Sequence, residues 1–400
     1  MAYLVNPGGR IVAVADEEVE KLLTQGFRRT TQQEQEETIK ARQTLAEQTN
    51  THYDPGTDGV YMATVSQGGK DGYGIASANI LKELHKQGVN ISTHNTGQKI
   101  ALLFHNPYSI LRLEAPYRIL YTMFESDKIP DDWKEYLEAA DKILVPSQWC
   151  KQVFAKAGFD ATVVPLGYDD TVFTYSPRID KRANRQDFVF LHYNAFNLRK
   201  GFNEVFKAFV KAFDKTEPVR MVFKTTLENN PLPITKSEYP NIDIIHGKMS
   251  EKELLEVINR ADCFVYPSRG EGFGMTPLEA MATGIPAIVP NAHGISEYFD
   301  ADYMYEVKVK EKCPAIYSRY KGIDVGEMVI CDVDQLAKQM RYVYEHQDEA
   351  RTKGRAAAEY VKNWTFKKTA QQLKSIFDGT KTMNLQERPL KNNLRLEVVR

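Results

Sequence analysis

The chain of 400 residues lacks the features of membrane, metal-binding and disulfide-stabilised proteins. No apolar run approaches the roughly 20 residues that a helix needs to cross a bilayer. Its four cysteines include no Cys-x-x-Cys pair, and neither an Asp-x-Asp nor a histidine cluster is singled out at metal-ligand spacing, so neither a disulfide framework nor a metal site is expected. The beginning of the chain lacks the charged and apolar regions of a signal peptide. We therefore expect a cytoplasmic protein without an integral membrane segment.

An excess of charge of one sign is also lacking. Lys and Arg number 52 and Asp and Glu 53, which gives a formal net charge of −1. This balance removes a general electrostatic attraction to nucleic acid or to acidic membranes. What is present, 42% hydrophobic and 26% charged residues, is ordinary for a globular protein, and the length is sufficient for two domains.

The stretch from Asp262 to Glu297 organises the rest of the chain. It predicts a buried strand at 263–266, a loop with three glycines, a helix, and a second buried strand at 285–289. Thr276 fits the N-cap of the helix, and Gly284 fits its C-terminal stop. The free N–H groups at the start of this helix would face the glycine loop and favour an anion there.

Two glutamates frame this unit, Glu271 in the loop and Glu279 on the predicted helix. For Glu279 a structural explanation is available, because Thr-Pro-Leu-Glu fits a capping box in which the glutamate caps its own helix. Glu271 has no such explanation. A carboxylate beside a phosphate-binding loop repels the phosphate unless it faces another part of the ligand, such as sugar hydroxyls.

The motif SRGEGFGMTPLEAMATGIPAI, with seven residues between its two glutamates, resembles the paired-glutamate motif of retaining glycosyltransferases of family 4, which have the GT-B fold. The resemblance implies that Glu271 contacts hydroxyls of the donor sugar and that Glu279 contacts the ribose of the nucleotide. It also implies that the loop and the helix start bind the donor. The residues concerned are Gly272, Phe273, Gly274, Met275 and Thr276.

A basic pair, Arg199 and Lys200, lies between a predicted strand and a predicted helix. A lysine at a helix N-terminus is unfavourable unless an anion lies between them. Arg-Lys-Gly resembles the segment of the same family whose lysine holds the donor diphosphate, which implies that role for Lys200. Arg199 and Arg269 are the candidates for a helper cation. The family often has an arginine six residues before the lysine, where this chain has Asn194. The alternative is a solvated basic pair.

A glycine-rich loop, residues 66–74, follows the predicted strand 60–65. It lacks the Rossmann glycine spacing and is therefore weak as a nucleotide fingerprint. It resembles the loop after the first strand in the same family, where donor and acceptor meet. The resemblance implies donor contacts for Gly69, Gly72, Tyr73 and Gly74. A plain strand-to-helix turn is the alternative.

His105 and Glu125 follow the predicted strands 100–104 and 118–124. The carboxyl ends of parallel strands gather ligands, so both residues are candidates for the catalytic site, together with Glu271 and Lys200. Many relatives carry a histidine near the position of Glu125 that reaches the donor sugar. The alternatives are a structural histidine and a surface carboxylate.

Strands and helices alternate along both halves of the chain, which indicates parallel sheets covered on both faces. With the resemblance, the expected fold class is α/β with the GT-B architecture, two Rossmann-like domains facing across a cleft, with a small N-terminal appendage. The expected boundaries are 1–50 for the appendage and a linker helix, 51–180 for an acceptor domain, 181–363 for a donor domain, and 364–400 for a helix that crosses back to the first domain, plus a tail. Residues 300–326 fit no element.

The resemblance implies a retaining glycosyltransferase that moves a sugar from a UDP- or GDP-sugar to an acceptor hydroxyl, without a metal or a further cofactor. The acceptor is left open among a glycan, a lipid, a protein and a modified nucleobase, because acceptor contacts lie on variable loops. The oligomeric state is open as well. Two alternatives remain: a nucleotide-sugar epimerase on the same fold, and a non-catalytic sugar-nucleotide-binding module.

Overall fold

The structure is a computed structural model, and two compact units make up the chain, Met1–Asp54 and Pro55–Arg400. The residues that it describes are 2–5, 11–14, 23–24, 28–29, 58–63, 71–178, 186–195, 197–227, 235–383 and 385. Gly69 and the expected linker helix at about 30–50 lie outside these residues.

The first unit contains a small antiparallel sheet. Its central strand β1 (Ala2–Val5) pairs with β2 (Ile11–Val14) on one side and with β3 (Arg28–Arg29) on the other. The β1–β2 register places Ala2 opposite Val14 and Val5 opposite Ile11.

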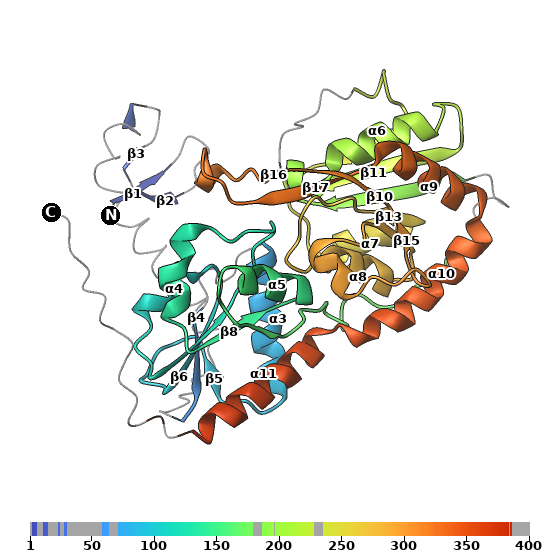
Figure 1. Cartoon of the computed structure of the whole chain (residues 1–400). Helices are drawn as coiled ribbons and strands as arrows, with labels where there is room; N and C mark the ends of the chain where they lie inside the picture. The colour runs from blue at the N-terminus through green and yellow to red at the C-terminus, as the bar shows by residue number, and fades with distance from the viewer. Residues whose placement is uncertain are drawn as a thin grey trace. The chain divides into compact units, whose positions relative to one another are not determined.

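The second unit contains two six-stranded parallel sheets, each belonging to one Rossmann-like domain (Figure 1). The sheet of the first domain has the order β5-β4-β6-β7-β8-β9. Its strands are β4 (Val60–Ala63), β5 (Ile91–Ser92), β6 (Ile100–Phe104), β7 (Tyr117–Tyr121), β8 (Lys142–Val145) and β9 (Thr162–Val163). The β6 strand is buried along its whole length, as expected for a continuous apolar run in a sheet covered on both faces.

Three α-helices accompany this sheet within the described residues: α3 (Gly72–Lys86), α4 (Lys134–Glu138) and α5 (Gln148–Lys156), with short 3-10 turns at η2 (Pro107–Arg112) and η3 (Asp131–Trp133). The start of α3 is fixed by Asp71, whose side chain accepts a hydrogen bond from the backbone N–H of Gly74 at 2.7 Å. Ser147 caps α5 in the same way, through the N–H of Cys150 at 3.1 Å.

The sheet of the second domain has the order β12-β11-β10-β13-β14-β15. Its strands are β10 (Phe188–Asn194), β11 (Val219–Thr225), β12 (Ile242–Ile245), β13 (Cys263–Val265), β14 (Ala287–Val289) and β15 (Tyr305–Glu306). The helices are η4 (Leu198–Lys200), α6 (Phe202–Ala212), α7 (Glu251–Arg260), α8 (Met275–Ala282), η5 (His293–Glu297), α9 (Val333–Glu345) and α10 (Gln347–Tyr360).

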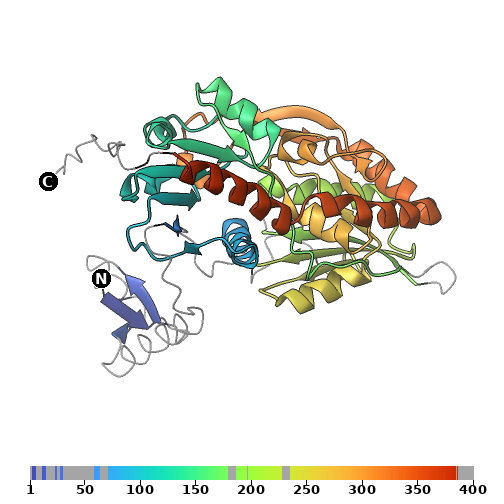
Figure 2. The ribbon, with the colours of Figure 1, turned by 90° about the horizontal axis from the view of Figure 1, so that it is seen from below.

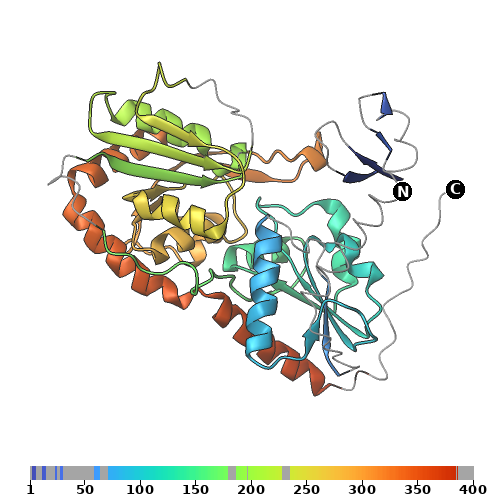
Figure 3. The ribbon, with the colours of Figure 1, turned by 180° about the vertical axis from the view of Figure 1, so that it is seen from behind.

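The two domains are joined twice along the chain. The first connection, which follows β9, touches the second where Tyr168 forms a β-bridge with Thr365. The second connection runs from α10 through η7 (Val361–Asn363) into α11 (Phe366–Lys381), which packs along α3 of the first domain (Figures 2 and 3). Side chains of both domains share one hydrophobic core, for example Ile80 and Leu84 of α3 with Leu373 of α11.

Residues 309–331 form an antiparallel hairpin that sequence reasoning did not find; we call it the arm. Its strands are β16 (Val309–Pro314) and β17 (Glu327–Cys331), with the turn η6 (Ser318–Tyr320) between them (Figure 1). Most of β16 is exposed, and its sequence VKEKCP has no apolar face. The usual signal of a strand, a buried apolar run, is therefore missing.

None of the helices in the described ranges is long and apolar enough to span a bilayer.

Candidate active site

Each sheet has a point at which its strand order reverses. In the first sheet this point lies between β4 and β6, and in the second it lies between β10 and β13. Ligands of open parallel sheets bind beyond the carboxyl ends of the strands at such points. The segments that leave these four strands include His105 after β6, Arg199 and Lys200 after β10, and Glu271 after β13. Topology therefore gathers the residues that the sequence singled out.

The glycine loop joins β13 to α8, but the helix begins differently from the prediction. Its N-cap is Gly274, in the left-handed conformation at φ 88°, and Thr276 lies inside the helix. The predicted Thr276 cap and the capping box of Glu279 are therefore wrong. Gly274 carries no side chain to cap the first turn, so its N–H groups stay directed at the loop, where they favour an anion. Gly284, at φ 94°, follows the C-cap as expected.

A compact group of charges lies at the switch point of the second sheet. Glu271 is buried, and its Oε1 accepts hydrogen bonds from Lys200 Nζ at 2.7 Å, Ser268 Oγ at 2.7 Å and Tyr266 OH at 2.8 Å. Arg199 Nη1 lies 3.2 Å from the same oxygen. We call Glu125, Arg199, Lys200 and Glu271 the charged cluster; their side chains are 8% to 25% exposed.

The cations of the cluster keep Glu271 ionised despite its burial. Burial alone would raise the pKa of Glu271, but Lys200 and then Arg199 hold this pKa well below its ordinary value. Burial lowers the pKa of Lys200, and Arg199 adds to this effect, whereas the ion pair with Glu271 opposes it. Glu271 is thus a permanent negative charge facing two cations.

Glu125 enters the cluster from the first domain. Its Oε1 lies 3.3 Å from Arg199 Nη2, and Tyr317 OH donates to its Oε2 at 3.3 Å. The strand before it, β7, ends at Tyr121 and not at Phe124 as predicted, so Glu125 lies on the loop beyond the strand. The contact with Arg199 makes Glu125 part of an ion-pair chain between the two domains.

The two domains touch directly at this place, and the glycines of the loop make the contact possible. A Cβ atom at Gly270 would lie 2.1 Å from the carbonyl oxygen of Glu125, and one at Gly272 would lie 2.7 Å from Met123. Only residues without a side chain permit this approach. Ser147 Oγ of the first domain donates to the carbonyl of Gly272 at 2.8 Å, which holds the loop against that domain.

Glu279 has different surroundings on the second turn of α8. Its Oε2 accepts a hydrogen bond from Tyr193 OH at 2.9 Å, at the carboxyl end of β10. Burial raises the pKa of Glu279 to about 7. Asn194 donates from Nδ2 toward His192 Nε2 at 2.7 Å and adds no charge, so neutralisation of an anion is left to Arg199 and Lys200.

Comparison with known proteins agrees with this geometry. Residues 177–311, about a third of the chain, match the model of the family described as glycosyl transferases group 1, and the matched range includes Arg199, Lys200, Glu271 and Glu279. The putative glycosyltransferase ORF313 of Acidianus filamentous virus 1 is 26% identical over 250 residues, which are 62% of this chain and 73% of that protein.

Solved structures extend the likeness to both domains. Anabaena Alr3699/HepE, in complex with UDP and glucose, has a TM-score of 0.56 and 12% identity over 80% of this chain and 99% of that chain. A glycosyltransferase from Rickettsia africae has a TM-score of 0.55 and 13% identity over 83% of this chain and 99% of that one. The fold is GT-B. The predicted fold class is confirmed.

Across the interface, residues of the first domain face the start of α8. A Cβ atom at Gly72 would lie 3.7 Å from Met275 Cε, so the N-terminus of α3 lies beside the N-terminus of α8. Tyr73 OH donates to the carbonyl of Met123 at 3.4 Å, and its ring lies against His105 with centroids 4.9 Å apart. Gly72, Tyr73 and His105 thus lie close to one another and to the segment that presents Glu125.

Some residues of the site were missed by sequence reasoning. Tyr266 was taken only as the end of a strand, and Ser268 was not singled out, although a polar residue just past a strand end and three positions before Glu271 is a usable signal. His293 also belongs to the site; its Nε2 lies 3.0 Å from the carbonyl of Ser268, and its φ is 43°. No sequence pattern indicated Tyr317 as a residue of the site, because the arm was not recognised.

In the described part of the chain, no three His, Cys, Asp or Glu side chains are grouped as metal ligands. Two Asp-x-Asp triplets were passed over in the sequence. In the first, Asp300 accepts from the N–H of Asp302 at 2.9 Å, and in the second Asp332 caps α9 through the N–H of Asp334 at 2.8 Å. Both triplets organise local turns.

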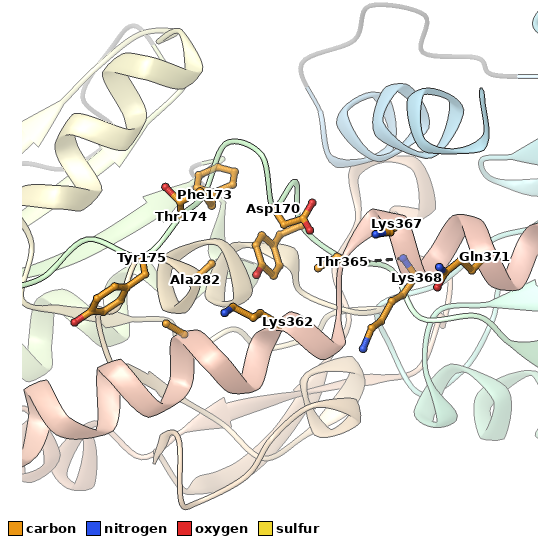
Figure 4. A pocket seen from close by; sticks show the side chains of 12 residues that line it. Asp170, Phe173, Thr174, Tyr175, Ala282, Lys362, Thr365, Lys367, Lys368 and Gln371 are labelled. Carbon is orange, nitrogen blue, oxygen red and sulfur yellow. Dashed lines mark hydrogen bonds between the residues drawn. The ribbon is translucent and has the colours of Figure 1, made fainter. Parts of the chain in front are cut away.

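A cavity of about 530 Å³ lies at the two connections between the domains (Figure 4). None of the residues that line it belongs to the charged cluster. Its walls come from the two connections between the domains, with Tyr168, Phe173 and Tyr175 on the first and Thr365 and Lys368 on the second. Because both connections line it, its shape depends on the angle between the domains.

Proposed function

We propose that the chain is a retaining glycosyltransferase that transfers a sugar from a nucleotide-diphosphate sugar to an acceptor hydroxyl without a metal. The observation that carries the proposal is the charged cluster. Arg199, Lys200 and Glu271 lie at the switch point of the second sheet, next to an uncapped helix N-terminus, in a GT-B fold whose second domain matches glycosyl transferases group 1.

The cluster is suited to a donor that carries both a diphosphate and sugar hydroxyls. Arg199 and Lys200 are balanced by Glu125 and Glu271, so an added diphosphate must displace a carboxylate from the cations. The hydrogen bonds to Glu271 converge on Oε1, which leaves Oε2 for a sugar hydroxyl. Glu279, eight positions further on, is proposed to accept a hydrogen bond from a hydroxyl of the ribose.

In the proposed reaction, the bond between C1 of the sugar and the phosphate oxygen breaks. Lys200, Arg199 and the N-terminus of α8 stabilise the negative charge that develops on the leaving diphosphate, the role that a metal has in other enzymes. The acceptor oxygen forms the new bond to C1 on the face from which the diphosphate leaves, and its proton passes to a leaving phosphate oxygen. The configuration at C1 is retained.

The proposed donor is a UDP- or GDP-sugar, and UDP is supported by the complex of Anabaena Alr3699/HepE with UDP and glucose. The acceptor class is open among a glycan, a lipid, a protein and a modified nucleobase. A further cofactor is not part of the proposal. We propose a cytoplasmic location, which fits the four cysteines, all of them in described ranges and all unbridged.

The test screens UDP- and GDP-sugars for binding by thermal shift and then measures turnover of the sugars that bind, with and without a panel of acceptors. The expected product has the same anomeric configuration as the donor, as determined by NMR, and it forms equally well in the presence of EDTA. Inversion of configuration, or activity that EDTA abolishes and a divalent ion restores, contradicts the mechanism. Donor isomerised without an acceptor indicates an epimerase, and binding without any product indicates a non-catalytic module.

A further inference from the structure

In the chain the arm lies between β15 and α9 of the second domain, but it is packed into the first domain. Ala315, Tyr320, Val325 and Met328 are buried in the hydrophobic core of the first domain. The hydroxyl of Tyr320 accepts from Trp133 Nε1 at 3.0 Å and lies 2.6 Å from the hydroxyl of Tyr108. This part of the arm is therefore anchored in the first domain.

Polar contacts also fasten the arm, near the turn end of its strands, to the residues that follow Glu125. The backbone N–H of Glu327 donates to Asp127 Oδ1 at 2.7 Å, and Lys312 Nζ donates to Asp127 Oδ2 at 2.9 Å. Ser126 donates to the carbonyl of Val325. The arm thus holds the loop on which Glu125 lies.

Tyr317 is the residue of the arm that reaches the charged cluster. Its hydroxyl donates to Glu125 Oε2 at 3.3 Å, and its ring lies against Phe124 with centroids 5.0 Å apart. Burial, followed by the charge of Glu125, raises the pKa of Tyr317, so the phenol keeps its proton and remains a donor. The other oxygen of Glu125 faces Arg199, so the carboxylate is held from two sides.

We propose that Tyr317 is a positioning residue for Glu125 in the transfer reaction, an inference that rests on the proposed function. When the donor diphosphate binds Arg199, the ion pair between Arg199 and Oε1 of Glu125 is broken. The hydrogen bond from Tyr317 to Oε2 then keeps the carboxylate in its orientation, with Oε1 directed at the sugar. A group held in this way acts on the transition state, where positive charge develops on the sugar, more than on donor binding.

The test compares Tyr317→Phe with Tyr320→Phe in the full chain, measuring kcat and the donor KM. Both variants remove one hydroxyl from the arm and keep the ring, but Tyr320 bonds to Tyr108 and Trp133 and not to Glu125. Tyr317→Phe is expected to lower kcat about tenfold, the loss of one hydrogen bond to a charged group, with the donor KM changed by less than about twofold. Tyr320→Phe is expected to lower the Tm and leave kcat unchanged.

A double-mutant cycle with Glu125→Gln separates positioning from a general structural role. If Tyr317 acts through Glu125, then Tyr317→Phe causes no further loss of kcat in the Glu125→Gln background. Additive losses, or a kcat of Tyr317→Phe within about twofold of the unchanged chain, overturn the proposal. If the unchanged chain turns over no nucleotide sugar, the proposed function itself fails and this inference falls with it.

Discussion

Glu271 and Glu279 belong to one continuous motif, but the loop and the helix that carry them give their carboxylates opposite electrostatic surroundings. In the loop, Glu271 faces Lys200 at 2.7 Å and Arg199 at 3.2 Å, and these cations overcome burial and hold its pKa well below the ordinary value. On the helix, Glu279 has the neutral donor Tyr193, and burial raises its pKa to about 7.

This difference separates two functions that the motif alone does not distinguish. A carboxylate that stays ionised at every working pH is suited to hold cations and sugar hydroxyls through a reaction cycle. A carboxylate that titrates near neutrality makes ligand binding depend on pH. The predictions below test this contrast, from the largest expected effect to the smallest.

The largest effect is expected for Glu271→Gln, which keeps the shape of the side chain and removes its charge. Transfer should fall by at least about a hundredfold, because the group acts where charge develops. Binding of free UDP or GDP should not weaken, since the cations lose a competing carboxylate. Steady-state kinetics and calorimetry measure the two quantities.

The glutamine variant is preferred to Glu271→Ala for a structural reason. Glu271 is buried between two cations, so removal of the whole side chain leaves both without this partner and costs about 3–5 kcal/mol of stability. Full activity of Glu271→Gln would disprove the assignment of the site.

The next effect concerns Lys200. Lys200→Ala should weaken binding of the nucleoside diphosphate by about 1.5–3 kcal/mol, the range for hydrogen bonds to charged groups. Lys211→Ala is the matched control, because Lys211 lies in the same domain, is exposed and pairs with Asp334. Equal affinities of the two variants by calorimetry would remove Lys200 from the diphosphate site.

A smaller effect is expected for Glu125→Gln. The change removes the charge that faces Arg199 and keeps the hydrogen-bonding geometry, so kcat should fall about tenfold while the donor KM stays equal or falls. The KM does not rise because Arg199 becomes freer to bind phosphate. A raised KM with an unchanged kcat would make Glu125 a ground-state contact only.

Sequence reasoning found the second domain more completely than the first. The residues of the proposed donor site there lie in two short segments, so spacing and residue type identify Lys200 and Glu271 together. In the first domain the site is assembled from side chains far apart in the chain, such as His105 and Glu125, and topology alone brings them together. Strand ends were also hard to place, since the apolar residues Met123 and Phe124 continue the run of β7 beyond its end at Tyr121.

Two kinds of feature were out of reach. Helix α8 starts at Met275, one residue before the predicted cap Thr276, because its N-cap is Gly274, which turns the chain in a left-handed conformation and has no side chain to form the predicted capping hydrogen bond. Strand β16 of the arm has no apolar periodicity, because most of it is exposed. The arm is stabilised by single side chains, such as Tyr320 and Met328, that are buried in the core of the first domain, and local sequence patterns do not report burial against a distant segment.

The smallest effect is a pH dependence that separates Glu279 from Glu271. A carboxylate accepts hydrogen bonds from a ribose diol with both oxygens only when it is ionised. With a pKa of about 7, Glu279 is mostly ionised at pH 8 and mostly neutral at pH 6. The affinity for UDP or GDP should therefore rise about threefold to tenfold from pH 6 to pH 8, and calorimetry across this range measures it.

Stability should change in the opposite direction. The pKa of Glu279 is raised in the folded chain above the ordinary carboxyl value of 4.5, so its contribution to stability is complete below pH 4.5 and is lost as the pH rises through 7. The ligand-free protein should thus lose thermal stability over the same range in which it gains affinity for the nucleotide. Thermal unfolding with and without the nucleotide compares the two trends.

Glu279→Gln provides the control, because it keeps the shape and cannot titrate. The terminal phosphate of the nucleotide has its own pKa near 6 and adds a pH dependence that both proteins share. His192 and His293, whose pKa burial lowers to about 4, do not titrate between pH 6 and pH 8. The difference in the pH dependence of nucleotide affinity between the unchanged chain and Glu279→Gln therefore isolates the contribution of the glutamate. If the affinity changes with pH equally in the two proteins, Glu279 has only a structural role beside Tyr193.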